Sequence, residues 1–232
     1  MTFRVESKLL NIRPYQQRDR NRVRELCVAT GYLGQPVDSI FEDTELFADF
    51  LTAYYTDCEP ESAFVVESEG LVVGYLLGAR HSEKHKRFYL SRAPVWLLKV
   101  LGRFLFYRPS TRRYFYWLLF RGRSETPAVP KGLAHFHINL LPEARCLETS
   151  RQLVDVFLKY LHEAGEKGVY GQMVTVGGRR TDRVFERFGF QVLNRQEVTK
   201  FRGIHPEPVF LCTVQKEFTT GTRLYARSQA DL

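Results

Sequence analysis

The first eighty residues carry apolar side chains in two different periods, which predict strands and helices in succession. In residues 41–55 the apolar positions recur at i, i+3 and i+4, the spacing of one helix face. Two β-rich runs farther along flank Ser68-Glu69-Gly70, a turn typical of a hairpin. The patterns predict a strand at 9–15, helices at 18–30 and 41–55, and strands at 62–67 and 71–78.

The second half of the chain alternates between strand and helix patterns. Its central helix carries Leu153, Phe157 and Leu161 on one face. Such alternation predicts a parallel crossover within a mixed sheet, the α+β form of an α/β fold. We therefore expect one domain over residues 1–218 and a loosely held tail at 219–232. The predicted segments are strands at 133–141, 169–176, 190–201 and 208–218, and helices at 149–164 and 181–188.

Residues 81–130 form a basic, aromatic insert between the third and fourth predicted strands. Its apolar runs at 94–107 and 111–120 are predicted to be two short helices, divided at Pro109, with Ser110 as the N-cap of the second. Each run is too short to span a bilayer as a helix.

The insert also holds the positive charge of the chain, whose formal net charge is +8. Between Arg80 and Arg123 there are 12 Lys or Arg residues and one acid, Glu83, which leaves 22 bases and 25 acids elsewhere. A basic, apolar surface suits an anionic lipid, with Trp96 and Trp117 as the expected membrane contacts, or an acidic acyl carrier protein. The insert alternatively completes the core or covers the substrate as a lid. Nucleic acid is disfavoured because the aromatic residues cluster in apolar blocks.

Composition predicts a cytoplasmic protein, or one attached to a membrane surface. The first residues lack the apolar run of a secretory signal, and no stretch of eighteen apolar residues is present. The four cysteines are far apart, which predicts neither a disulfide framework nor a zinc site. His81 and His85 have the i, i+4 spacing of helical metal ligands but lack a third ligand, so we expect a solvated face and no metal.

Two segments of the second half resemble the GNAT superfamily of acyl-CoA-dependent N-acyltransferases. They are His137-Ile-Asn-Leu-Leu-Pro-Glu-Ala-Arg145, which precedes a helix, and Val184-Phe-Glu-Arg-Phe-Gly-Phe190. In the first half, residues 54–61 and 72–78 look like bacterial members related to the acetyltransferase-like domain of O-GlcNAcases. The resemblance covers residues 9–80 and 133–217.

The resemblance implies a GNAT fold with a helical insert, and transfer of an acyl group from acetyl-CoA or another acyl-CoA to a small-molecule or peptide amine. In the family, backbone amides of a loop with the pattern Q/R-x-x-G-x-G/A hold the coenzyme A pyrophosphate. Here Glu148 and Ser150 replace both glycines. The residues that the resemblance places around the coenzyme are Leu140, Leu141, Arg145, Cys146, Leu147, Glu148, Thr149, Ser150, Arg151 and Phe185.

Two departures from the family pattern favour a second hypothesis. Glu148 brings a negative charge beside the expected phosphates, and two like charges about 4 Å apart repel by roughly 1 to 4 kcal/mol. Its side chain alternatively caps its own helix. Phe185 stands where many family members have a tyrosine that protonates the coenzyme thiolate, although a thiol with a pKa of about 8.5 leaves without help. The alternative function is a catalytically silent GNAT-like binding or regulatory module.

The acceptor amine must lose a proton before it attacks, so the site needs a base. His135, His137 and Asn139 are predicted to share one strand face, and His137 is our candidate because imidazole titrates near neutral pH. Asn139 is its expected catalytic neighbour; alternatively, these side chains only hydrogen-bond across the sheet. Four residues are expected to line the acceptor side, where the acids recognise a cation, or else to cap the second helix: Tyr54, Tyr55, Asp57 and Glu59.

Overall fold

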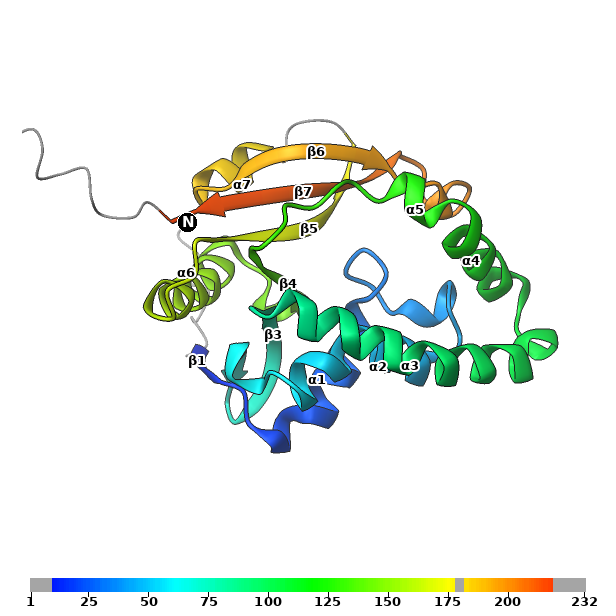
Figure 1. Ribbon diagram of the computed structural model, residues 1–232, viewed down its shortest axis with the longest axis horizontal. Coiled ribbons are helices and arrows are strands. Elements are labelled where there is room, and N and C mark those ends of the chain that lie inside the picture. The colour runs from blue at the N-terminus through cyan, green and yellow to red at the C-terminus, as the bar shows by residue number, and fades with distance from the viewer. Residues whose placement is uncertain (1–9, 178–181, 219–232) are drawn as a thin grey trace, which may run out of the picture.

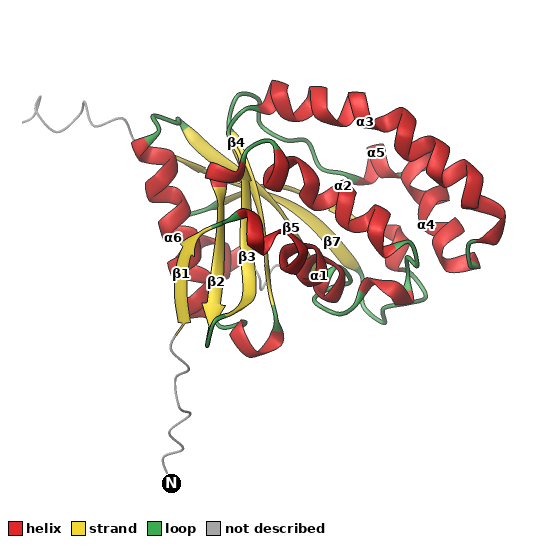
Figure 2. Cartoon of the chain, turned by 90° about the horizontal axis from the view of Figure 1, so that it is seen from below, coloured by secondary structure: helices red, strands yellow, loops and turns green. Residues whose placement is uncertain are grey.

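The computed structural model describes residues 10–177 and 182–218, and its centre is a seven-stranded mixed sheet with helices on both faces (Figures 1 and 2). The strand order is β1-β2-β3-β4-β5-β7-β6, and only the β4–β5 pair is parallel. This confirms the predicted mixed sheet with its parallel crossover. The strands are β1 Leu10–Pro14, β2 Ala63–Ser68, β3 Leu71–Ala79, β4 Ala134–Leu140, β5 Gly168–Val176, β6 Gln191–Glu197 and β7 Val209–Glu217.

Two helices begin at a side chain that accepts a hydrogen bond from a first-turn amide, and a third begins with a proline, which has no amide hydrogen to satisfy. The Asp43 side chain accepts a hydrogen bond from the Leu46 amide, so α2 begins three residues later than the apolar pattern predicts. The helix after β4 begins at Leu147, two residues earlier than predicted. The helices are α1 Arg20–Thr30, α2 Thr44–Asp57, α3 Ser82–Arg103, α4 Pro109–Phe120, α5 Gly122–Glu125, α6 Leu147–Glu163 and α7 Asp182–Arg187.

Two hydrophobic cores cover the two faces of the sheet, because successive strand side chains point to opposite faces. Tyr75 and Leu77 of β3 join the core beneath α1 and α2, whereas Leu76 joins the core beneath α6. The stripe predicted for the central helix fills this second core, where Phe157 and Leu161 are fully buried. Burial of each such side chain contributes about 1.5 to 3 kcal/mol.

The two parallel strands separate soon after they meet. Only Ala134–Phe136 of β4 pair with Val169–Gly171 of β5. Beyond that point β5 stays paired with β7 as far as Val176, while β4 stays with β3 as far as Leu140. The sheet is therefore split between the second halves of β4 and β5.

The insert is helical, but its helices differ from the predicted ones. α3 runs unbroken from Ser82 through Pro94, so this proline does not begin a helix. α4 begins with Pro109 at its first position, where a missing amide hydrogen costs nothing, and its N-cap is Arg108; the prediction of Ser110 as the N-cap is wrong.

The insert connects the two halves of the split sheet (Figure 1). α3 packs along α2, and α4 then reaches the turn between β6 and β7. There the Lys200 Nζ atom donates to the Tyr114 hydroxyl at 3.1 Å, and the Thr199 amide donates to the Glu125 carboxylate at 2.7 Å. Within the described residues, no helix combines the length and apolarity needed to cross a bilayer.

Candidate functional site

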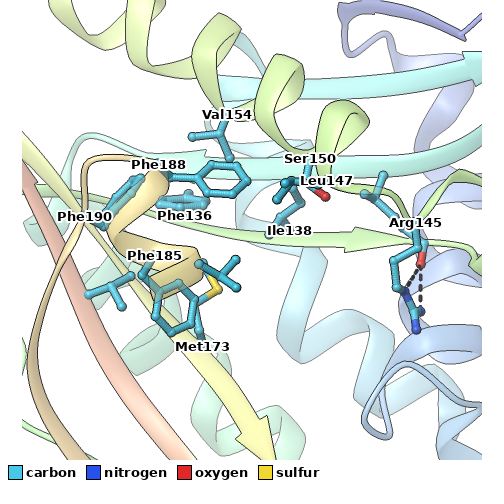
Figure 3. A pocket seen from close by; sticks show the side chains of 13 residues that line it. Phe136, Ile138, Arg145, Leu147, Ser150, Val154, Met173, Phe185, Phe188 and Phe190 are labelled. Carbon is cyan, nitrogen blue, oxygen red and sulfur yellow. Dashed lines mark hydrogen bonds between the residues drawn. The ribbon is translucent and has the colours of Figure 1, made fainter. Parts of the chain in front are cut away.

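A cleft of about 280 Å³ opens at the split between β4 and β5, on the α6 side of the sheet (Figure 3). Apolar side chains from β4, β5, α6 and α7 form most of its wall. The residues that line it are Phe136, Ile138, Leu140, Arg145, Leu147, Ser150, Val154, Met173, Val184, Phe185, Phe188, Phe190 and Val214.

One edge of the cleft is the backbone of β4. The Leu141 amide donates to the Val73 carbonyl of β3 at 2.9 Å. Because hydrogen-bonding groups alternate between the two sides of a strand, the backbone groups of Ile138 and Leu140 face the split instead. The resemblance implies that the backbone of Leu140 and Leu141 pairs with the extended pantetheine arm of the coenzyme. Leu140 has the orientation that such pairing requires. Leu141 does not, and Ile138 takes its place.

The N-terminus of α6 lies at the mouth of the cleft, and a thiol caps it. The Cys146 Sγ atom accepts a hydrogen bond from the Thr149 amide at 3.4 Å and lies 3.0 Å from the Thr149 hydroxyl. Both contacts lower the pKa of Cys146, and the contact with the hydroxyl has the larger effect. Glu148 does not plug the turn, because its exposed carboxylate accepts from the Gln152 side chain at 2.8 Å, one turn along the helix. The predicted cap by Glu148 is wrong.

Arg145 joins two chain segments at the mouth of the cleft. Its Nη2 atom donates to the Leu140 carbonyl at 2.9 Å and to the Gly34 carbonyl at 3.1 Å. Gly34 has φ +84°, and an added Cβ would lie 2.4 Å from the Arg145 Nη1 atom, so a larger residue here would strain the backbone and displace the guanidinium. Arg145, which the resemblance placed around the coenzyme, therefore binds two carbonyl groups in this structure.

The other predicted coenzyme contacts lie around the same helix end. The Ser150 hydroxyl donates to the Cys146 carbonyl at 2.9 Å, and Arg151 is exposed and lies 3.8 Å from Asp155. Phe185 lies on α7, and its ring stands beside Met173 in the cleft wall (Figure 3). The structure thus brings the N-terminal turn of α6 and Phe185 together around one cleft.

On the opposite face of β4, His137 carries an unpaired nitrogen. Its Nε2 atom is buried and has no hydrogen-bond partner among the described residues. Burial has the largest effect and lowers the pKa of His137 to about 4, although a hydrogen bond to the Leu51 backbone acts to raise it. Since Nε2 is the nitrogen without a partner, the contact with the Leu51 backbone is assigned to Nδ1–H, which leaves Nε2 as an acceptor. The ring does not keep the near-neutral pKa that the sequence argument assumed.

His135 and His85 share the hydroxyl of Tyr55 between them. The Tyr55 oxygen lies 2.9 Å from the His135 Nε2 atom and 3.3 Å from the His85 Nε2 atom. Burial lowers the pKa of His135 to about 3 and that of His85 to about 4, so both rings are neutral. Sequence reasoning missed His85, which was predicted to be solvated. Its i, i+4 spacing from His81 was the feature of the sequence that could have indicated a functional role. Its burial results from the packing of α3 against α2.

The remaining residues expected at the acceptor side have internal partners. Glu59 is fully buried and accepts hydrogen bonds from the Tyr54 hydroxyl at 2.7 Å and the Arg80 amide at 2.6 Å. Asp57 forms a two-point ion pair with Arg20 at 2.8 and 2.9 Å. The expectation that these two carboxylates face a cationic substrate is therefore not met.

Asn139 also has a partner within the protein. Its side-chain amide donates to the Tyr75 hydroxyl at 2.9 Å, which fixes it against β3. Of the residues predicted on the acceptor side, Tyr55 is the one that lies beside His137, with ring centroids 5.0 Å apart. Elsewhere in the described residues, no cluster of three or more His, Cys, Asp or Glu side chains is suited to a metal ion.

Solved structures with a similar fold include several that are named as N-acetyltransferases. SsHAT is 28% identical over 90% of this chain and 98% of its own, with a TM-score of 0.59. The Drosophila melanogaster polyamine N-acetyltransferase is 14% identical over 90% and 100%, with a TM-score of 0.55. The mosquito arylalkylamine N-acetyltransferase like 5b is 12% identical over the same shares, with a TM-score of 0.56.

No protein-family model matches the chain, and no curated protein sequence does. The narrower resemblance to the O-GlcNAcase-associated domain stays a prediction. The split between β4 and β5, the cleft within it and the likeness over nine tenths of the chain agree with one another. The fold of this chain is therefore that of the GNAT N-acyltransferases.

Proposed function

We propose that this protein transfers an acyl group from acyl-CoA to an amine, with the thioester held in the cleft between β4 and β5. The observation that carries the proposal is the split itself. It leaves both backbone groups of Ile138 and the amide of Leu140 facing an apolar cleft, and an extended pantetheine arm can pair with them as a strand would. The Leu140 carbonyl already accepts from Arg145. The pairing needs backbone only, so the altered loop sequence does not prevent it.

The phosphate end of the coenzyme would lie at the N-terminus of α6, where free amides and the helix dipole favour an anion. One of these amides is already engaged, because the Thr149 amide donates to the Cys146 thiol. We expect the thiol to turn away when a phosphate binds. The guanidinium of Arg145 already lies at this mouth and would contribute positive charge without leaving Leu140.

Acyl transfer would proceed by attack of the amine nitrogen on the thioester carbon. The new C–N bond forms, the C–S bond breaks, and the coenzyme leaves as a thiolate. Phe185 carries no acidic hydrogen, so the thiolate takes its proton from solvent, which a thiol with a pKa of about 8.5 allows.

His137 would accept the proton that the amine nitrogen loses on attack. Its Nε2 atom is a buried acceptor without a donor, and a substrate N–H would supply one. Because this atom is covered in the present structure, the amine must displace a neighbour, and the ring of Tyr55 is the nearest aromatic candidate at 5.0 Å.

The acceptor class follows from the side chains around His137. Asp57 and Glu59 are both engaged, whereas the rings of Tyr55 and Tyr75 lie 5.0 and 5.7 Å from the imidazole. Such a wall suits an aromatic amine better than a polycation. Proteins of this fold include acetyltransferases named for both kinds of amine, which makes the contrast testable.

The test combines binding and turnover. Thermal unfolding should shift upward with acetyl-CoA, because a ligand at 100 times its Kd adds about 2.7 kcal/mol of stability. Release of free thiol should then depend on the amine, and we expect phenylethylamine to be a better acceptor than agmatine. Unfolding that ignores every acyl-CoA would contradict the proposal and favour the silent module. Binding without thiol release from any amine would contradict the catalytic part alone.

A further inference from the structure

The insert carries an apolar ridge whose side chains are each more than half exposed. On α3 the outward residues Leu90, Leu97, Leu98 and Leu101 repeat at helical spacing. At the turn between α3 and α4, the farthest point of the insert from the sheet, Leu105 is 83% exposed and Phe106 is 86% exposed (Figure 1). Outward residues of α4 continue the exposed apolar surface: Tyr116, Leu119 and Phe120.

The two tryptophans do not belong to this ridge. Trp117 is buried and donates its indole hydrogen to Glu125, and Trp96 packs against Phe50 with ring centroids 5.3 Å apart. The expectation that both contact a membrane is therefore wrong. α3 has two apolar faces, of which the one with Trp96 packs on α2 and the one with Leu98 faces outward.

Positive charge surrounds the ridge. Of the 12 Lys and Arg residues between positions 80 and 123, five lie within 4 Å of a carboxylate in the described residues. The other seven have no such partner there. Two of them share the outward faces, because Arg87 precedes Leu90 by three positions and Arg112 precedes Tyr116 by four.

We infer that this ridge, residues 87–120, docks on the surface of an anionic lipid bilayer. A projecting turn with leucine and phenylalanine at its tip can enter the acyl region, while the flanking cations stay among the headgroups. A second copy of the chain fits poorly, because its ridge would bring the same excess of positive charge. An acidic protein would satisfy the charge but would have to supply a matching groove for an exposed tip. The inference is independent of the proposed catalytic function.

Vesicle sedimentation with the full chain tests this inference. Phosphatidylcholine vesicles with and without one third phosphatidylglycerol are the probes, at low and at physiological salt. We expect binding to the anionic vesicles only, weakened by salt. The double variant Leu105→Ser, Phe106→Ser should bind at least about tenfold more weakly, because each buried apolar side chain contributes about 1.5 to 3 kcal/mol. Arg87→Gln with Arg112→Gln should cost about fivefold per charge.

The matched controls lie elsewhere on the surface. Leu71→Ser removes a leucine that is 66% exposed at the β2–β3 turn, and Lys159→Gln removes an exposed cation of α6. Both should bind vesicles like the wild type. All the replaced side chains are exposed, so thermal unfolding should change little and loss of binding would not reflect misfolding. Equal binding to neutral vesicles, no binding to either, or a ridge variant that dissolves a wild-type dimer would overturn the inference.

Discussion

The two faces of β4 differ in what they leave open. On the α6 face, Ile138 and Leu140 border a cleft that a ligand can enter. On the α2 face, His135 and His137 are packed among tyrosines and carry the titratable groups. The α6 face therefore has a cleft that can hold a ligand but is lined mostly by apolar side chains. The α2 face has the titratable imidazoles but little room for a ligand. The split beside β4 is the place where the two faces can meet.

This contrast suggests that one face binds the thioester and the other accepts the proton of the amine. A thioester held along the cleft needs backbone groups and apolar contact, which tolerate sequence change. An amine approaching from the α2 face needs an acceptor for its proton, which depends on particular side chains such as His137. The departures Glu148 and Phe185 both lie on the cleft side, where the fold can compensate for them.

Filling the cleft should give the largest effect. Ile138→Trp places an indole between β4 and α7, so we expect no stabilisation by acetyl-CoA and no measurable transfer. The measurement is thermal unfolding with and without acetyl-CoA, followed by thiol release. Leu71→Trp, at an exposed site far along the hairpin, is the control and should behave like the wild type. An Ile138→Trp protein that still binds acetyl-CoA would place the coenzyme elsewhere.

Removing the acceptor nitrogen on the other face should separate chemistry from binding. His137→Phe keeps a ring in the cluster but lacks Nε2, and we expect kcat to fall by about 10² to 10⁴ while the Kd of acetyl-CoA stays unchanged. His162→Phe, on the exposed surface of α6, is the control. A variant that loses coenzyme affinity in proportion to kcat would show that the two faces are not independent.

The buried imidazoles should make stability depend on pH. The folded pKa values of His135 and His137, about 3 and about 4, lie below the value of about 6.5 in an unfolded chain. The unfolded state therefore binds more protons, and stability falls as pH drops below about 6.5, by roughly 1.4 kcal/mol per unit and per ring. Below about pH 4 the loss due to His137 levels off.

Urea unfolding at pH 7.5 and pH 5.0 measures this dependence. Between these values each of the two rings should cost of the order of 2 kcal/mol, and His135→Phe should remove its share of the slope. The same substitution leaves the Tyr55 hydroxyl with one imidazole partner, so its stability at pH 7.5 should also be lower. An unchanged slope in His135→Phe would mean that this ring is not buried in the neutral form.

Most of the fold could be predicted because it depends on local patterns. The period of the apolar residues located every strand of the sheet, and the stripe of Leu153, Phe157 and Leu161 located the central helix. Helix starts were predicted less well. The Asp43 and Cys146 caps are single side-chain contacts, and thiols are seldom expected as caps.

The candidate site was predicted less completely, because its groups are defined by packing. Leu140 and Leu141 are neighbours in sequence, yet only the pairing of β4 with β3 decides which one faces the split. Glu59 looked like a substrate ligand until its burial against Tyr54 was visible. His85 is far from His135 along the chain and reaches it only through α3.

The smallest expected effect concerns the charge at the mouth of the cleft. Glu148 is exposed in the first turn of α6 and hydrogen-bonds to Gln152, a contact that glutamine can keep. Glu148→Gln should tighten acetyl-CoA binding by about two- to fivefold, because it removes about 0.3 to 1 kcal/mol of repulsion from the phosphates in a solvated site. It should also lower the free energy of unfolding by about 0.3 to 1 kcal/mol, because the helix dipole favours a negative charge at this end.

Titration calorimetry measures the change in acetyl-CoA affinity, with Glu163→Gln at the other end of α6 as the control. Equal affinity in all three proteins would place the phosphates away from this helix end, and the contrast between the faces of β4 would then rest on the pantetheine arm alone.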